Sequence, residues 1–336
     1  MQSASAPVGV LLVNLGTPDA PEPKAVRKYL AEFLADPRVV ELPRVLWLPI
    51  LHGVILNTRP AKSAKAYAAI WEEATNEGPL KAVLRRQAES LRESAANGAL
   101  GAAPVVVEYA MRYGAPSLQS GLQSLMGAGC DRILVAPLYP QYAASTTATA
   151  FDAVAKALGK LRRQPTLRFL PPYYDDPAYV DALAGSLREG LAQFDFEPEV
   201  ILASFHGLPQ FQIDEGDPYR AHCETTWRLL REAMGLSERQ LRLSFQSRFG
   251  RAKWIEPYTS ETVRSLAAEG VKRLALLAPG FSADCLETIE EIGVEIRDEF
   301  LEAGGEKFAR VACLNDSPAG MRLIETLVKR ELAGWV

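Results

Sequence analysis

His206 is the side chain of this sequence best placed for acid–base chemistry. It follows an apolar run at residues 200–203, where a buried strand would end. In an open α/β sheet, ligands bind beyond the carboxyl ends of the strands. An imidazole exchanges protons near neutral pH and also binds metals. A strand-end histidine can instead simply bond a loop carbonyl, and its position alone does not separate the two interpretations. The other histidines are His52 and His222.

Three carboxylates could form a second chemical group. Asp284, Glu287 and Glu291 are spaced i, i+3, i+7, so on an α-helix they share one face. Burying three carboxylates together is costly unless a cation or a proton transfer uses them. In the alternative interpretation Asp284 only caps the helix, and acids in the first turn complement the helix dipole.

An imidazole combined with carboxylates suits a loosely held, borderline divalent metal such as Fe²⁺ or Zn²⁺. The sequence also contains an unusual apolar segment, residues 44–56, which Pro49 and Gly53 interrupt. It is either a kinked core helix or a half-exposed apolar lip that touches a hydrophobic ligand or a membrane surface. Together these features suit a flat, apolar ligand that loses N–H protons as it takes up a metal.

A basic run follows the apolar segment, with Arg59, Lys62 and Lys65 at the start of an expected helix. Such charges usually form a solvated face. Beside an apolar lip they could also pair with ligand carboxylates or lipid phosphates.

The elements that must position these groups alternate between strand and helix, which predicts a mostly parallel sheet. Short apolar runs predict strands at residues 8–13, 105–109, 132–137, 166–170, 200–203, 241–246, 273–278 and 308–314. Amphipathic stretches predict helices at residues 24–35, 79–97, 117–126, 149–161, 176–192, 225–234, 259–268, 285–303 and 318–332.

The two halves of the chain repeat each other. Residues 10–18 (VLLVNLGTP) correspond to residues 200–209 (VILASFHGLP), and Arg112-Tyr113-Gly114 corresponds to Arg248-Phe249-Gly250. The repeat predicts two doubly wound, Rossmann-like α/β domains that share a cleft. Leu15 and His206 each precede a glycine in corresponding loops, and we expect them to face each other across a bound ligand. The expected boundaries are residues 1–150, 151–315 and a helical segment 316–336 that packs back on the first domain.

Composition excludes several other classes of protein. The chain has 336 residues, 48% hydrophobic content and a net charge of −4, which argues against nucleic acid as the main partner. Its four scattered cysteines form no CxxC pair, a pattern typical of a reduced, cytosolic protein. The N-terminal run resembles neither a signal peptide nor a membrane span. No GxGxxG follows the first strand, which disfavours a nucleotide-binding enzyme.

Several motifs together resemble the signature of the ferrochelatase family, from about residue 8 to the last helix. The matching segments are NLGTP at 14–18, YPQY at 139–142, STT at 145–147, ASFHGLP at 203–209, GDPY at 216–219, Thr226 and SADCLET at 282–288. The resemblance implies a class II chelatase-like fold and insertion of Fe²⁺ into protoporphyrin IX, the terminal step of haem synthesis. Iron is then a substrate, no permanently bound cofactor is implied, and the partners are the porphyrin and, peripherally, a membrane surface.

The resemblance also implies roles for individual residues. His206 and Glu287 would be the essential pair, and Asp284 and Glu291 would extend the metal-binding acidic path. The residues expected to contact porphyrin are Leu15, Trp47, Leu48, Ile50, Arg59, Arg112, Tyr113 and Tyr139.

Three features depart from other family members. Cys285 replaces the histidine of animal members, which puts a secondary metal role there in doubt. Leu15 replaces a methionine or tyrosine, so no axial ligand is expected from that face. A cysteine-rich C-terminal tail is missing, so no [2Fe–2S] cluster is expected. Coproporphyrin chelation, Co²⁺ or Ni²⁺ chelation, and non-catalytic tetrapyrrole binding stay open as alternatives.

Overall fold

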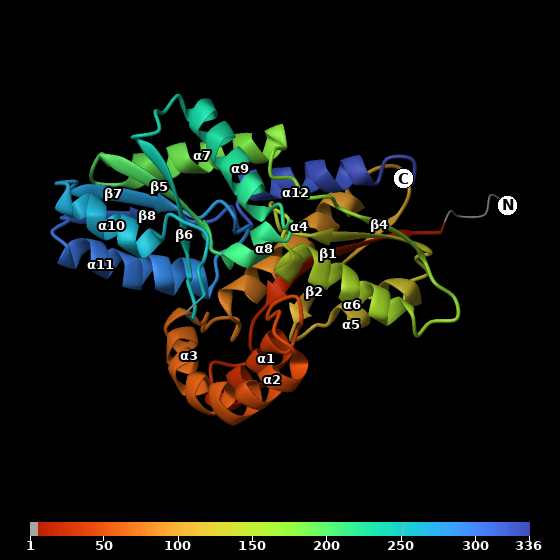
Figure 1. Cartoon of the computed structure of the whole chain (residues 1–336). Helices are drawn as coiled ribbons and strands as arrows, with labels where there is room; N and C mark the ends of the chain where they lie inside the picture. The colour runs from red at the N-terminus through yellow and green to blue at the C-terminus, as the bar shows by residue number, and fades with distance from the viewer. Residues whose placement is uncertain (1–5, 251) are drawn as a thin grey trace. The chain divides into compact units, whose positions relative to one another are not determined.

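The computed structural model describes residues 6–250 and 252–336; residues 1–5, part of the N-terminal run discussed above, lie outside it. Two compact units make up the chain (Figure 1). The first contains the described residues up to Leu138, with Ala144–Pro171 and Met321–Val336. The second contains Tyr139–Ala143 and Pro172–Gly320. Within the described residues, no helix is long and apolar enough to cross a membrane.

The first unit is built on a four-stranded parallel sheet in the order β2-β1-β3-β4. Its strands are β1 (Val8–Gly16), β2 (Val105–Tyr113), β3 (Arg132–Pro137) and β4 (Thr166–Phe169). Leu11 of β1 pairs with Glu108 on one side and Val135 on the other. A strand flanked by others and covered by helices on both faces is buried throughout, which explains the continuous apolar run at residues 8–13.

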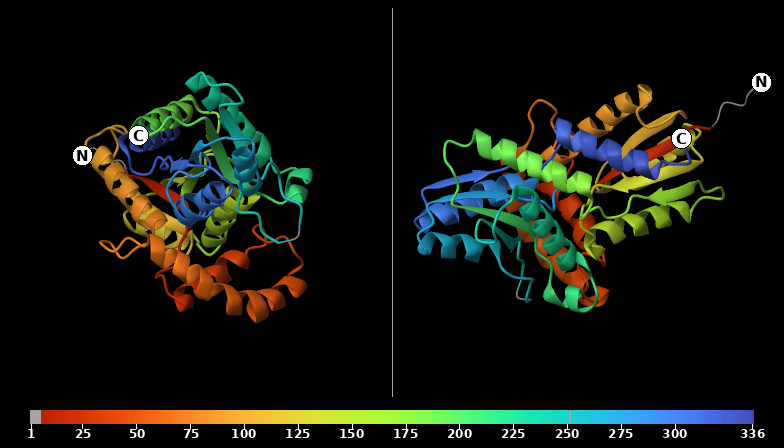
Figure 2. Two further views of the ribbon diagram at one scale, coloured as in Figure 1. Left: turned by 90° about the vertical axis from the view of Figure 1, so that its left-hand side faces the viewer. Right: turned by 90° about the horizontal axis from the view of Figure 1, so that it is seen from above.

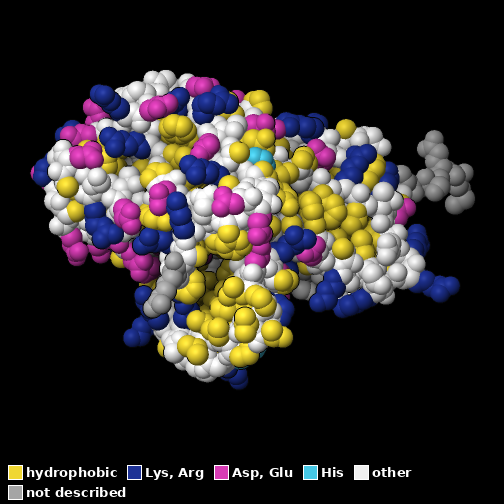
Figure 3. Space-filling view, in the orientation of Figure 1, with side chains coloured by type: hydrophobic (Ala, Val, Ile, Leu, Met, Phe, Trp, Pro, Cys, Tyr) yellow, Lys and Arg dark blue, Asp and Glu magenta, His cyan; other side chains and the backbone are white. Residues whose placement is uncertain are grey.

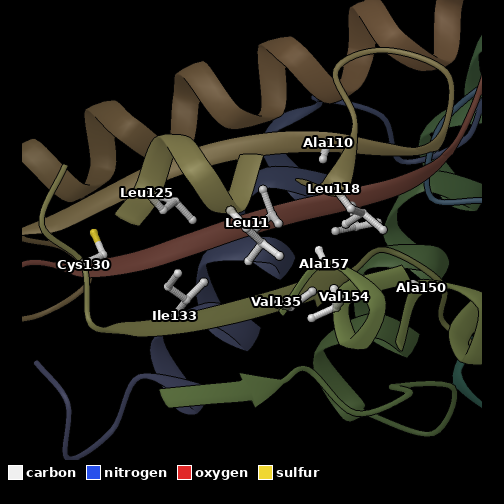
Figure 4. Packing of buried hydrophobic residues seen from close by; sticks show 12 residues of the cluster. Leu11, Ala110, Leu118, Leu125, Cys130, Ile133, Val135, Ala150, Val154 and Ala157 are labelled. Atoms are coloured by element: carbon white, nitrogen blue, oxygen red, sulfur yellow. The ribbon is translucent and has the colours of Figure 1, made fainter. Parts of the chain in front are cut away.

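Helices cover this sheet. They are α1 (Pro23–Leu34), α2 (Arg44–Ile50), η1 (Leu51–Ile55), α3 (Leu56–Ile70), α4 (Pro79–Ala96), α5 (Leu118–Gly127), η2 (Ala144–Ala148) and α6 (Thr149–Leu158). Figure 4 shows Leu11 among core side chains from α5 and β3, including Leu125 and Val135.

The second unit repeats this sheet in the order β6-β5-β7-β8, again fully parallel. Its elements are β5 (Val200–His206), β6 (Leu241–Gln246), β7 (Arg273–Leu277), β8 (Lys307–Arg310), α7 (Pro177–Gln193), α8 (Gln210–Asp214), α9 (Tyr219–Met234), α10 (Thr259–Ala268), η3 (Glu287–Ile296) and α11 (Arg297–Glu302). Equal strand order in the two units confirms the predicted α/β class and the internal repeat. Leu202, Leu276 and Ile292 belong to its core.

A C-terminal segment completes the first unit. Helix α12 (Pro318–Glu331) runs back over that unit toward β4 (Figures 1 and 2). Arg168 of β4 donates hydrogen bonds to the carbonyls of Glu331 and Ala333, and its guanidinium lies 4.1 Å from the ring centre of Trp335. Arg132 of β3 donates to the Trp335 carbonyl at 3.0 Å.

The helix expected at residues 285–303 is not a single α-helix. Residues Glu287–Ile296 form the π-helix η3, and only Arg297–Glu302 continue as α-helix. The repeat extends to this feature, because η2 and α6 follow β3 as η3 and α11 follow β7. π-Helical turns are rare and are frequently found at functional sites.

Candidate active site

His206 lies at the end of β5 and is its last residue, because the strand runs to residue 206 rather than ending at residue 203. Its Nδ1 lies 2.6 Å from the carbonyl oxygen of Gly207. A carbonyl oxygen only accepts, so Nδ1 carries a proton and Nε2 of the neutral ring keeps its lone pair. The histidine therefore does bond a loop carbonyl, and the same bond orients the ring for proton or metal binding at Nε2.

The turn after His206 requires glycine. The N–H of Gly207 donates to the Gln246 carbonyl at 2.8 Å. A Cβ at this position would lie 2.8 Å from that same oxygen and 3.0 Å from the ring of Trp254. A larger residue would push the turn off β6 and move the imidazole with it.

Glu287 is the first residue of η3. Its backbone carbonyl accepts a hydrogen bond from Nε2 of Gln246 at 3.2 Å. Gln246 is also the register partner of His206 across β5 and β6. The end of β6 therefore connects the histidine turn with the start of the acidic helix.

Glu291 lies one π-turn after Glu287. A π-helix, with its i→i+5 hydrogen bonds, has more than 3.6 residues per turn. The side chains of residues four apart, such as Glu287 and Glu291, therefore lie more nearly one above the other along the helix axis. Both carboxylate oxygens of Glu291 accept hydrogen bonds from Ser247, at 2.8 Å from N–H and 2.6 Å from Oγ. Burial raises the pKa of Glu291 to about 7, against the lowering effect of those bonds and with a further rise from Glu287. Near neutral pH this carboxyl can hold or release a proton.

Asp284 has a different environment from the two glutamates. One oxygen accepts from Arg310 and from Oγ1 of Thr288 at 2.8 Å, and the other accepts from Nδ2 of Asn315 at 2.8 Å. Both of its oxygens are thus occupied, and its charge is balanced by a guanidinium. The adjacent Cys285 is buried, and burial raises the pKa of its thiol well above the usual range, so it stays protonated.

Among residues 6–250 and 252–336, no three His, Cys, Asp or Glu side chains are grouped so as to hold a metal ion.

Leu15, Arg112 and Tyr113 lie at the carboxyl ends of β1 and β2 in the first unit. Leu15 is half-buried, and Tyr113 is 1% exposed. The Tyr113 hydroxyl donates to Asp36 at 3.0 Å, and Arg112 pairs with the same carboxylate while its Nε donates to the Thr149 carbonyl at 2.8 Å. These bonds anchor Arg112 and Tyr113 within the first unit. Tyr139, which follows β3, is also buried.

The apolar segment at residues 44–56 is helical, with the π-helical turn η1 between α2 and α3, and one of its faces is exposed. We call α2 and η1 together the lip. Val45 is 81% exposed, Leu46 63% and Val54 54%, and Figure 3 shows hydrophobic side chains gathered over the region where Figure 1 labels α1, α2 and α3. On the opposite face Trp47 is buried and its indole N–H donates to the Leu34 carbonyl at 2.7 Å.

The remaining lip and basic residues differ in exposure. Ile50 is exposed, whereas Leu48 and Arg59 are half-buried. Lys62 and Lys65 of α3 are exposed.

Sequence reasoning missed Gln246 and Ser247, which contact the acidic helix. The available signal was their position, immediately before the Arg248-Phe249-Gly250 copy of the repeat.

Comparisons with known proteins place the chain in a family. The family model described as Ferrochelatase matches residues 7–332. A ferrochelatase of Methylocella silvestris is 56% identical over 335 residues, covering 99% of this chain and 96% of the relative. A ferrochelatase of Mesorhizobium japonicum is 55% identical over 330 residues, covering 98% and 92%.

Solved structures share the fold. SirB from Bacillus subtilis, solved with Fe³⁺, aligns with a TM-score of 0.57 at 13% identity, covering 98% of this chain and 97% of that one. CbiX, described as a terminal enzyme of sirohaem biosynthesis in denitrifying bacteria, aligns with a TM-score of 0.51 at 16% identity, covering 97% and 100%. At these identities the likeness shows the chelatase-like fold alone.

Proposed function

Because the chain belongs to the ferrochelatase family of metal chelatases, we propose that it inserts Fe²⁺ into protoporphyrin IX, the terminal step of haem synthesis. The observation that supports this most directly is the connection between His206 and Glu287 through Gln246. It brings a proton-accepting imidazole and a carboxylate-bearing helix to one end of the second sheet.

The reaction must remove two pyrrole protons while a dehydrated cation enters the macrocycle. We assign His206 as the base or entry-path ligand, through Nε2, and Glu287 as its partner. A positioned base contributes roughly 10²–10⁴-fold. Glu291, with a pKa of about 7, is suited to receive a proton and pass it to solvent. Asp284 is assigned to holding η3 through Arg310 and Asn315, because a metal would have to displace those bonds.

The porphyrin itself must be bent for its nitrogens to be reached, and the strain is supplied by binding energy from the rest of the ring. Leu15, Leu48 and Ile50 offer apolar contacts. Arg59 carries a charge that suits a ligand carboxylate, while Arg112, which is paired with Asp36, would line the site together with Trp47, Tyr113 and Tyr139. In this proposal iron is a substrate, and neither a resident cofactor nor a [2Fe–2S] cluster takes part.

The test is anaerobic turnover by the purified protein of protoporphyrin IX and of coproporphyrin with Fe²⁺, followed by loss of porphyrin fluorescence and gain of haem absorbance. We expect protoporphyrin to be the better substrate. Faster turnover of coproporphyrin, or of Co²⁺ or Ni²⁺ with a more polar tetrapyrrole, would replace the substrate assignment. Binding without conversion would make the protein a carrier.

A second proposal concerns the lip, which combines exposed Val45 and Leu46 with the exposed cations Lys62 and Lys65 on the following helix. Apolar side chains flanked by lysines suit peripheral contact with an anionic membrane surface. Such contact would supply an apolar porphyrin without exposing it to water.

A further inference from the structure

Gln246 lies at the junction between the two elements that carry the proposed chemistry. Its backbone carbonyl accepts from Gly207 N–H at 2.8 Å, directly after His206. Its side-chain amide donates to the Glu287 carbonyl at 3.2 Å, at the first residue of η3. One residue therefore fixes both the turn that presents the imidazole and the point at which the acidic helix begins.

The amide of Gln246 is itself held in one orientation. Its Oε1 accepts from Oγ of Ser204 at 2.7 Å. Oγ of Ser204 lies 2.8 Å from Oγ1 of Thr259, which lies 2.9 Å from Oγ of Ser244. All four side chains are at most 3% exposed. Because Oε1 faces the serine hydroxyl, the NH₂ group must face Glu287, and a flipped amide would set two oxygens against each other.

Because the Gln246 amide is buried, turning it away from these partners would cost free energy. A buried carbonyl or hydroxyl deprived of its partner costs the full desolvation penalty of that group. A second contact joins η3 to the residue that follows β6, because Ser247 bonds the Glu291 carboxylate. The bond from Gln246 ends on a backbone carbonyl, so its effect on the chemistry would act through the position of η3.

We propose that Gln246 is a positioning residue for metal insertion: its amide sets the separation between the His206 imidazole and the Glu287 carboxylate. This inference rests on the proposed function, since it concerns the same pair of groups. It predicts that loss of the amide lowers the rate of metal insertion and leaves the affinity for porphyrin unchanged. Displacements on the order of 1 Å cost up to ~10²-fold in rate.

The first experiment compares Gln246→Met with Ser244→Ala in the full-length protein. Methionine fills a similar volume without the donor, whereas Ser244→Ala disturbs the same buried hydroxyl group without touching Gly207 or Glu287. We expect kcat for Fe²⁺ insertion to fall roughly ten- to hundredfold in Gln246→Met. The Kd for protoporphyrin, from fluorescence titration, should stay within about twofold, and Ser244→Ala should keep its kcat.

An unchanged kcat in Gln246→Met would overturn the inference, and so would an equal fall in both variants, which would mark a general packing effect. Wild-type protein is assayed alongside. If it forms no haem, the proposed function is wrong. If the wild type and Gln246→Met are equally active, only the positioning role of Gln246 is wrong.

Gln246→Glu provides a test even if the methionine variant does not fold. A protonated carboxyl keeps both an acceptor and a donor, while an ionised one loses the donor toward Glu287. The ratio of variant to wild-type kcat should therefore be highest at the acid end of the accessible range and fall as pH rises. A constant ratio across that range would contradict a role for the donated hydrogen bond.

Discussion

Both carboxylate oxygens of Glu291 accept hydrogen bonds from Ser247, one from the backbone N–H and one from the hydroxyl. The bonds favour the ionised form, yet burial outweighs them and raises the pKa of Glu291 to about 7. Ser247 adopts a left-handed backbone with φ of 64°, an uncommon conformation for a residue other than glycine. The residue after β6 therefore places both its N–H and its hydroxyl against the Glu291 carboxylate.

Glu291→Gln should change how stability depends on pH. In wild type the folded pKa exceeds the unfolded one, so the folded state binds more protons between about pH 4.5 and 7 and loses stability as pH rises through that window. The variant lacks this loss, so its free energy of unfolding relative to wild type should increase by up to about 3 kcal/mol from pH 4.5 to pH 8. Urea unfolding measures it. Glu295→Gln, on the exposed part of the same helix, is the control; a pH-independent difference for Glu291→Gln would refute the assignment.

His206→Ala should abolish chelation while the fold and porphyrin binding persist, since it removes the imidazole and leaves β5 intact. A loss of at least ~10²-fold in kcat is expected from the missing base alone. His222→Ala is the matched variant: that ring stacks on Tyr174 at 3.6 Å, and its Nδ1 accepts from Tyr142 N–H. We expect His222→Ala to lose stability more than activity. Retained turnover in His206→Ala would remove the central assignment.

Glu287→Gln should lose activity with unchanged size and circular dichroism, because the backbone carbonyl that Gln246 contacts is still present. The neutral amide can neither accept a proton nor attract the cation, so kcat should fall by roughly 10²-fold or more. Steady-state kinetics with protoporphyrin and Fe²⁺ measures this. A rate near that of wild type would show that the carboxylate is dispensable.

Val45→Ser combined with Leu46→Ser should weaken association with anionic vesicles, because both side chains are exposed and would be buried on contact. Losing them should lower the partition coefficient roughly tenfold or more. Cosedimentation is the measurement, and Leu301→Ser removes an exposed leucine elsewhere as a control. Lys62→Gln with Lys65→Gln should weaken the same association mainly at low salt. If vesicle binding is indifferent to both pairs, the lip serves the ligand alone.

Arg310→Met should destabilise the second unit. Its guanidinium is paired with Asp284 in a largely buried pair, and removing one partner leaves the carboxylate uncompensated, at a cost of about 3 kcal/mol. Denaturant unfolding tests this. Lys307→Met breaks an exposed pair with Asp195 and should change stability little. Equal losses in the two variants would mean that burial of the Asp284 pair is unimportant.

The strands could be predicted because a continuous apolar run indicates a strand that is buried on both faces. The internal repeat indicated that the two sheets would have the same strand order. Helix boundaries were harder. Helix α9 begins at Tyr219 rather than at residue 225, and the Tyr219 N–H is bound by the side chain of Asp217. The short helix α8 was not predicted, because five residues carry no periodic signal.

The π-helix and the roles of its neighbours depend on distant contacts. Gln246 binds Glu287, Ser247 binds Glu291 and Asn315 binds Asp284 just before η3, all from positions that local spacing does not reveal. The Tyr113 hydroxyl donates to Asp36, far earlier in the chain, a contact that local spacing does not reveal either. His206 was placed correctly because its location follows from the end of a strand, which a local pattern does show.

The return of α12 to the first unit has a consequence for the order in which the protein can fold. The leucines at 323, 327 and 332 are buried, yet a ribosome makes them after both sheets. A newly made first unit therefore keeps apolar surface uncovered while the whole second unit is synthesised. During that interval the nascent chain is the form most exposed to aggregation and most dependent on chaperones.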